Sequence, residues 1–139
     1  MAEQLLTLQA ADPVEWCEAN IQLDYGAFDR NNHPLMTEPM RAGASMRGGV
    51  VGLLGSVQHI KTLCAQLLQL YTAQVSPGRQ AHYDLTLQTL KEFSDDKWTP
   101  ILNNTPAIKR LVPDQRHAQT TYYTQFPYGF IRLLSAGIL

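Results

Sequence analysis

The stretch from residue 48 to residue 74 constrains the fold of this chain most. It begins with two glycines, which are followed by a short apolar run at residues 50–54, a loop, and an apolar helical pattern that begins at Lys61. This order predicts a buried strand, a tight turn and a helix. Gly55, Lys61 and Thr62 match three positions of the phosphate-binding pattern Gly-x-x-x-x-Gly-Lys-[Ser/Thr], whose backbone N–H groups point at phosphate oxygens.

Ile60 stands where this pattern places its second glycine. Glycine permits the positive φ angles and the close approach that a phosphate loop needs, whereas a β-branched residue resists them. The segment therefore favours a phosphate-binding loop at three positions and disfavours it at a fourth. The spacing alone leaves a second interpretation open, in which Gly55 ends a strand and Lys61 lies in the first turn of a surface helix.

Composition places the chain among ordinary globular domains. With 139 residues, 45% of them hydrophobic and 17% charged, the chain can bury one core, so we expect a single domain over residues 1–139. A net charge of -1 disfavours a wholly basic nucleic-acid-binding domain. Two distant cysteines and the lack of a leader pattern favour a reduced, cytoplasmic setting, and no apolar run reaches membrane-spanning length.

Capping residues, turn residues and apolar periodicity predict alternating helices and strands. The helices are expected over residues 13–24, 37–46, 61–73, 87–98 and 106–112, separated by loops that include 26–36 and 76–79. The strands are expected over residues 50–54 and 80–85, followed by a hairpin of residues 120–124 and 130–134. Pro100 is expected to bend or interrupt its helix. The alternation predicts an α/β fold with a parallel β core, flanking helices and a C-terminal β-hairpin.

Several segments, in the same order along the chain, resemble one protein family. The chain is similar to the N-terminal part of the ATPase domain in the large terminase subunit of tailed bacteriophages of the lambda-like type. The segments that carry the resemblance are residues 12–16, 34–40, 50–58, 91–100 and 104–106 with Arg110. The resemblance implies a partial P-loop NTPase fold that uses ATP and Mg²⁺ to drive viral DNA packaging.

The resemblance also implies the site and the partners. The cofactor-binding positions that it implies are Gly55, Ser56, Gln58, His59, Lys61 and Thr62. In the family pattern Lys61 would contact the β- and γ-phosphates, and the Thr62 hydroxyl would be a ligand of Mg²⁺. The implied partners are double-stranded DNA, the small terminase subunit, the portal and further copies of the chain, in the cytoplasm of a bacterial host.

The sequence departs from this family at functional positions. No apolar run that ends in Asp-Glu follows the loop, so we expect the Walker B strand, the coupling motif and the nuclease to be absent. We therefore assign no catalytic residue and expect a fragment or a degenerate relative with negligible ATP turnover alone. The alternative function is a non-catalytic P-loop-like domain that acts through protein contacts.

Other candidate groups have simple structural explanations. Asp95 and Asp96 are neighbours on a predicted helix, where adjacent side chains point in different directions, so a solvated face is expected rather than an acid pair. The scattered histidines lack partners at metal-ligand spacing. The aromatic residues of the predicted hairpin favour cross-strand packing over a base-stacking platform. These aromatic residues are Tyr122, Tyr123, Phe126 and Tyr128.

Overall fold

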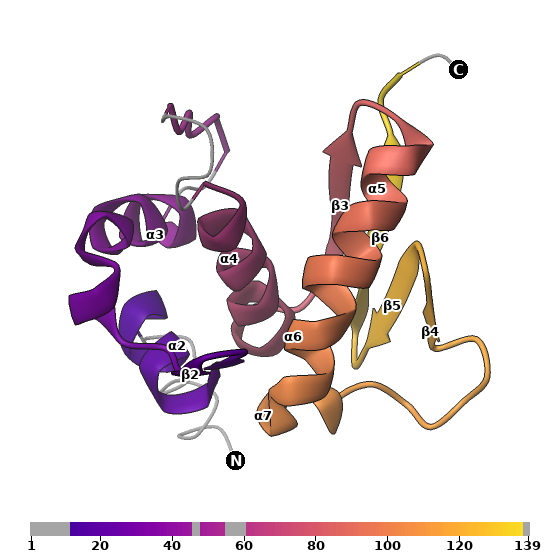
Figure 1. Cartoon of the computed structure of the whole chain (residues 1–139), viewed down its shortest axis with the longest axis horizontal. Helices are drawn as coiled ribbons and strands as arrows, with labels where there is room; N and C mark the ends of the chain where they lie inside the picture. The colour runs from indigo at the N-terminus through magenta and orange to yellow at the C-terminus, as the bar shows by residue number, and fades with distance from the viewer. Residues whose placement is uncertain (1–11, 46–47, 55–60, 138–139) are drawn as a thin grey trace.

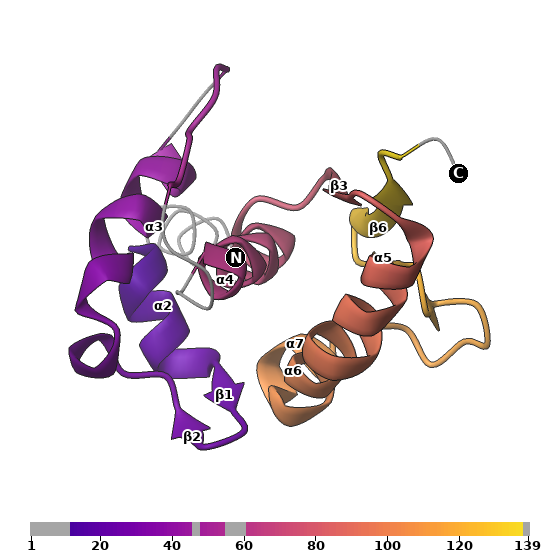
Figure 2. The same cartoon turned by 45° about the horizontal axis from the view of Figure 1, so that its top comes forward.

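The structure is a computed structural model that describes residues 12–45, 48–54 and 61–137. Helices gather in the N-terminal part of the chain, and a sheet with its own helical cover forms the C-terminal part (Figure 1). A view turned by 45° shows the same two groups of elements (Figure 2). Within the described ranges, no helix has the length and apolar character needed to cross a membrane.

Helix α2 (Pro13–Asn20) begins where the sequence predicted and ends earlier. The Asp12 carboxylate caps the helix by accepting a hydrogen bond from the N–H of Glu15 at 3.2 Å. After the helix, the two-residue strands β1 (Gln22–Leu23) and β2 (Gly26–Ala27) pair with each other. The predicted continuation of the helix to residue 24 is therefore wrong, because the backbone there finds cross-strand partners in a small hairpin.

The segment between β2 and the next helix was predicted as a loop and contains two 3₁₀ turns. These are η1 (Arg30–Asn32) and η2 (Pro34–Met36). They lead directly into helix α3 (Thr37–Ser45), which confirms the helix predicted there. Met36 and Met40 are buried, so this segment contributes side chains to the core although it contains little regular structure.

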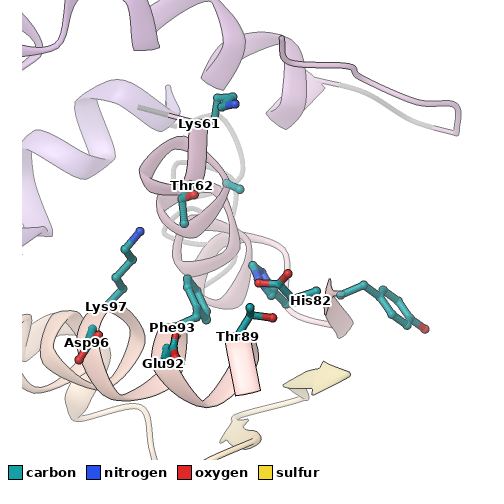
Figure 3. Close-up of a pocket in the computed structure, with 11 residues that line it drawn as sticks. Lys61, Thr62, His82, Thr89, Glu92, Phe93, Asp96 and Lys97 are labelled. Atoms are coloured by element: carbon teal, nitrogen blue, oxygen red, sulfur yellow. The ribbon is translucent and has the colours of Figure 1, made fainter. Parts of the chain in front are cut away.

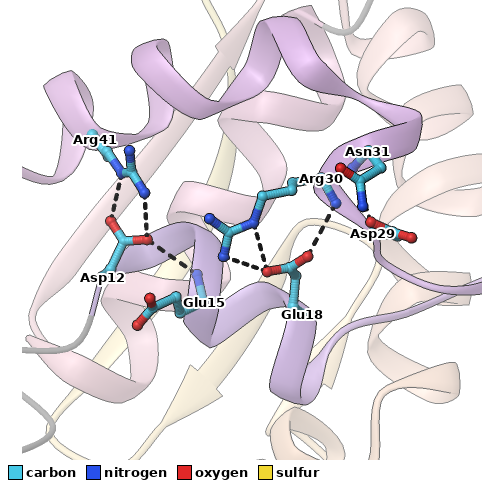
Figure 4. Close-up of polar contacts among 7 residues, drawn as sticks. All are labelled: Asp12, Glu15, Glu18, Asp29, Arg30, Asn31 and Arg41. Atoms are coloured by element: carbon cyan, nitrogen blue, oxygen red, sulfur yellow. Dashed lines mark hydrogen bonds and ion pairs between the residues drawn. The ribbon is translucent and has the colours of Figure 1, made fainter.

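Two arginines, one on η1 and one on α3, hold these elements against α2, as Figure 4 shows. The Arg30 Nε atom donates to the Glu18 carboxylate at 2.8 Å. The Arg41 Nε atom donates to the Asp12 carboxylate at the same distance. The Asp12 carboxylate therefore both caps α2 and holds α3, and its arginine partner lowers the pKa of its carboxyl group.

Residues 50–54 form no strand, so the prediction of a central buried strand is wrong. Val50 is 91% exposed and Leu54 is 100% exposed. Neither of the two described sheets includes these residues. An extended segment without a neighbouring strand leaves its backbone N–H and C=O groups to water, so apolar composition alone did not place it in a sheet.

Helix α4 (Lys61–Val75) confirms the helix predicted after the loop. Its buried side chains include Leu67 and Leu70, and the helix packs against both α2 and α3. The Trp16 and Tyr71 rings meet edge to face with their centroids 5.7 Å apart. This contact gives α2 and α4 a shared aromatic core.

The main sheet has the strand order β3-β6-β5-β4. Strands β3 (Arg79–Asp84) and β6 (Gly129–Ser135) are parallel, and β6 is antiparallel to β5 (Tyr123–Phe126), which pairs with β4 (Gln119–Thr120). The predicted hairpin is therefore confirmed, whereas one parallel strand pair is present among the described residues. The sheet is mixed because a tight turn joins β5 to β6, and only antiparallel neighbours can be joined so briefly.

Close backbone packing fixes the parallel pair. A Cβ atom on Gly129 would lie 2.2 Å from the carbonyl oxygen of Gly78, just before β3 begins. The N–H of Phe130 donates to that same carbonyl at 3.2 Å. Glycine is required at position 129 because any side chain there would push the two strands apart.

A nearly continuous helical segment covers one face of the sheet. It consists of α5 (Leu87–Phe93), the π-helical turn η3 (Ser94–Trp98) and α6 (Thr99–Asn104), with α7 (Pro106–Lys109) after it. Thr86 caps α5 as predicted. In Figure 1 this segment lies in front of the sheet.

Pro100 does not interrupt this segment as the sequence suggested. It lies in the first turn of α6, where a missing N–H group costs least, and the wider π turn lies immediately before it. The π turn buries Trp98, whose Nε1 donates to the Thr124 hydroxyl on β5 at 3.1 Å. The irregular turn therefore anchors the helical segment to the sheet.

Candidate functional site

A pocket of about 490 Å³ lies where α4 begins, β3 ends and the α5–η3 segment passes (Figure 3). Three hydrogen-bonded contacts hold its walls together. The Gln66 side chain donates to the backbone carbonyl of Lys97 at 2.8 Å, and the Gln80 side chain donates to that of Gln69 at 3.1 Å. The Gln69 Nε2 atom lies 3.1 Å from Nδ1 of His82. The pocket is thus formed by elements from both halves of the chain.

Lys61 and Thr62 lie in the first turn of α4 and line this pocket. The first turn of a helix carries the positive end of the helix dipole, so it attracts anions. Both side chains are half-buried. The phosphate-binding role that the family resemblance implied for them stays a prediction.

Four other predicted cofactor-binding residues cannot be placed against this pocket. Gly55, Ser56, Gln58 and His59 lie outside the described residues, as does Ile60. Their assignment stays a prediction. The structure therefore addresses only the helical end of the phosphate-binding pattern.

The wall opposite α4 carries charged side chains that sequence reasoning did not connect with the site. Asp84 lies at the end of β3, and Glu92, Asp96 and Lys97 come from the α5–η3 segment. A signal for Asp84 existed, because ligands commonly bind beyond the carboxyl ends of parallel strands. The residues on α5 and η3 carry no such signal, since only the tertiary fold brings that helix opposite α4.

The adjacent carboxylates Asp95 and Asp96 separate as predicted. Asp95 pairs with Lys91 at 2.6 Å on the exposed face of the helix, whereas Asp96 lines the pocket. Both side chains are exposed, so the expectation of a solvated face is correct for each of them, and Asp96 in addition lines the pocket. In the residues that the structure describes, no group of three or more His, Cys, Asp or Glu residues is arranged to hold a metal ion.

His82 forms the floor of the pocket. Its ring stacks on Phe93 with the centroids 4.4 Å apart and the planes 7° from parallel. Burial lowers the pKa of His82 because the charged imidazolium loses its hydration there. Gln69 Oε1, buried beside it, has no hydrogen-bond partner within the described part of the chain. The pocket therefore has a neutral aromatic floor between a helix N-terminus and a charged wall.

These residues fit a phosphate-bearing ligand better than a protein-held metal. The helix N-terminus with Lys61 supplies positive potential, and the Thr62 hydroxyl can serve as one oxygen ligand. Mg²⁺ in nucleotide sites is bound by a few protein oxygens together with phosphate oxygens and water. Such a cation would therefore arrive with the phosphates.

Comparison with known proteins identifies the family. The family described as phage terminase large subunit gpA, ATPase domain, matches residues 23–138 of the 139-residue chain. The chain belongs to this family. Comparisons with curated proteins and with solved structures found no match.

Proposed function

We propose that the chain is a nucleotide-binding part of a terminase large subunit, with a degenerate phosphate loop. The observation that supports this proposal best is the position of Lys61 and Thr62 in the first turn of a fifteen-residue helix that opens onto a pocket. A helix of this length carries a substantial dipole, and the family match supports ATP as the nucleotide. The proposed ligand is therefore ATP with Mg²⁺.

Each residue has a distinct part in the proposal. The Lys61 ammonium would neutralise charge on the terminal phosphates of ATP. The Thr62 hydroxyl would be one oxygen ligand of the Mg²⁺ ion that is bound to the nucleotide. Bound nucleotide supplies the energy that a packaging ATPase releases by hydrolysis. For this chain we expect binding without turnover, because its sequence has no apolar run that ends in Asp-Glu, the pattern that organises the cation and positions water in this family. The pocket carboxylates Asp84, Glu92 and Asp96 do not follow that pattern.

The proposed partners follow from the family. They are double-stranded DNA, the small terminase subunit, the portal and further copies of the chain, all in the cytoplasm of a bacterial host. No described contact identifies one of them, so they are part of the proposal.

Thermal unfolding with and without Mg-ATP tests the binding proposal. The wild-type chain is expected to melt higher with the nucleotide, and Lys61→Ala and Thr62→Ala are expected to remove the shift. Lys109→Ala, on the distant helix α7, is the matched control and is expected to keep it. A shift that survives Lys61→Ala would contradict the proposal, as would phosphate release above background that depends on Lys61.

A second function is favoured by the exposed run at residues 50–54. Four large apolar side chains there face solvent to a considerable extent, which suits a surface that a further copy of the chain covers. We propose as the alternative a non-catalytic domain that acts through this contact. Leu54→Asp would then disrupt self-association measured by light scattering, whereas Leu35→Asp, at an exposed site on η2, would not.

A further inference from the structure

The main sheet has one covered face and one open face. On the covered face, Ile131 and Leu133 of β6 are buried under the α5–η3 segment. On the other face, alternate residues of the same strands are exposed or half-buried, and none is buried. Parallel strand pairs in proteins normally have both faces covered. The open face of β3 and β6 is therefore a surface on which an occupant is expected.

The open face carries an unusual set of side chains. Its members are the alternate residues of β3, β4, β5 and β6 that lie on the face away from the helical cover. They include arginines and aromatic residues but no carboxylate. They are Arg79, Ala81, Tyr83, Thr120, Tyr123, Gln125, Phe130, Arg132 and Leu134. A face with two fixed positive charges and no negative charge complements a polyanion.

Arg132 lies at the centre of this face. Its guanidinium carbon lies 5.5 Å from the Tyr123 ring centroid and 5.3 Å from the Phe130 ring centroid. The two rings are themselves 5.6 Å apart. Neither Arg79 nor Arg132 has an ion pair among the described residues. The rings thus hold the guanidinium in place while leaving its charge without a carboxylate partner.

Aromatic side chains extend from this centre to the edge of the sheet. Tyr83, on the outermost strand β3, is 63% exposed, and it lies opposite Leu134 in the strand register. An exposed tyrosine beside an arginine-bearing strand offers a flat surface for stacking at some distance from the central charge. Stacking surfaces combined with cations are the features that bind bases and phosphates together.

We propose that this open face, defined by Arg79, Tyr83, Tyr123, Phe130 and Arg132, binds single-stranded nucleic acid. The arginines would contact phosphates, and the exposed Tyr83 ring would stack on a base, while the half-buried rings of Tyr123 and Phe130 would hold Arg132. A duplex is a poorer ligand because its bases are already stacked and hidden from the rings. A second copy docked by two-fold symmetry is also a poorer occupant, since it would place central arginines of like charge near one another.

Of the five residues that define this surface, Tyr83 also lines the pocket at the start of α4, and the other four do not. His82 and Asp84, which line that pocket, have the opposite parity on β3 and face α4 and α5. The two sites therefore lie on opposite faces of β3 and meet at Tyr83, whereas Arg79, Tyr123, Phe130 and Arg132 belong to the sheet face alone. Loss of nucleotide binding in Lys61→Ala leaves the sheet face intact, so each proposal can fail without the other.

Fluorescence anisotropy of a labelled oligothymidylate of roughly fifteen nucleotides, titrated with the full chain, tests the proposal. Tyr83→Ala is expected to weaken binding about fivefold or more, whereas Tyr83→Phe keeps the ring and is expected to bind as the wild type does. Arg79→Gln and Arg132→Gln are each expected to weaken binding and to lower the slope of log affinity against log salt by about 0.7. Lys109→Gln, a cation away from this face, is the matched control and is expected to change neither quantity.

Further oligonucleotides distinguish RNA from DNA, and single strands from duplexes, as the ligand of this face. Oligouridylate and oligothymidylate of equal length tell whether RNA or DNA is preferred, and either preference supports the proposal. Tighter binding of the corresponding duplex would overturn it, as would equal affinity of Tyr83→Ala and Tyr83→Phe. Failure of the wild-type chain to bind either oligonucleotide at low salt would overturn it too. Sedimentation that shows a dimer lost in Arg132→Gln, without nucleic acid binding, would assign the face to a second copy instead.

Discussion

The two segments that flank α4 had both been predicted as strands, and only one of them is a strand. Residues 50–54 are almost entirely apolar, yet they are exposed and unpaired in the described structure. Strand β3 (Arg79–Asp84) is much more polar, yet it forms six register pairs with β6. Hydrophobicity therefore did not decide which segment joined the sheet. A segment joined the sheet where a partner strand was available in register, because a strand is stable only when its backbone groups are paired.

The largest effect is expected from matched leucine substitutions in the two regions. Leu133→Ala, in the strand that pairs with β3, removes a side chain that is 4% exposed and is expected to lower the free energy of unfolding by about 2–5 kcal/mol. Leu54→Ala, in the exposed run, is expected to change it by less than about 0.5 kcal/mol. Urea unfolding followed by circular dichroism measures both. Similar losses in the two variants would mean that residues 50–54 are packed in solution.

Glycine substitutions provide a second matched pair. An alanine at position 129 would place its Cβ 2.2 Å from the Gly78 carbonyl, so Gly129→Ala is expected to cost about 1–3 kcal/mol. A Cβ at position 52 would meet nothing within 4 Å, so Gly52→Ala is expected to be nearly neutral. The same unfolding measurement applies. A neutral Gly129→Ala would show that the parallel pair is looser than the structure indicates.

A smaller, pH-dependent effect is expected from His82 on β3. Burial lowers the pKa of His82 in the folded protein, so the unfolded chain binds its proton more readily. Stability is therefore full above the ordinary histidine pKa of about 6.5 and falls as the pH drops through the folded value. His82→Gln is expected to reduce the change of stability with pH. The matched control, His117→Gln at an exposed position, is expected to show the same change of stability with pH as the wild type. Thermal melts between about pH 5 and pH 8 test both variants.

The smallest effect on stability is expected at Ile60. Ile60→Gly restores the residue of the phosphate-binding pattern just before α4, so nucleotide affinity measured by calorimetry with Mg-ATP is expected to rise. If the segment is only the start of a surface helix, glycine would instead cost up to about 1 kcal/mol and nucleotide would have no effect. A variant that melts lower and does not respond to Mg-ATP would therefore decide for the surface-helix interpretation.

Local sequence chemistry predicted much of the secondary structure. Asp12 and Thr86 cap helices as expected, the periodic pattern after Lys61 forms α4, and the aromatic tail forms the β5–β6 hairpin. The resemblance to the terminase large subunit, read from the order of short segments, agrees with the family match. These features depend on backbone geometry and side chains within a few residues of one another, which the sequence displays directly.

The site was only partly predictable. Lys61 and Thr62 were recognised by spacing and do line a pocket, but the facing residues Glu92, Asp96 and Lys97 were not. They reach the pocket because Trp98 anchors the π turn to β5 and because Gln66 binds the carbonyl of Lys97. Contacts between residues about thirty positions apart leave no periodic trace in a single sequence, as the separations of 31 and 26 residues show.

By itself the sequence determined the helix boundaries set by caps, the amphipathic α4, the hairpin and the family of the chain. Only the tertiary structure decided that residues 50–54 remain outside the sheet, that the sheet is mixed, and that Arg132 lies over two rings on an open face. The physical reason is the range of the forces involved. Capping and periodicity act within one or two turns of chain, whereas strand pairing and the covering of a face depend on which distant segments meet.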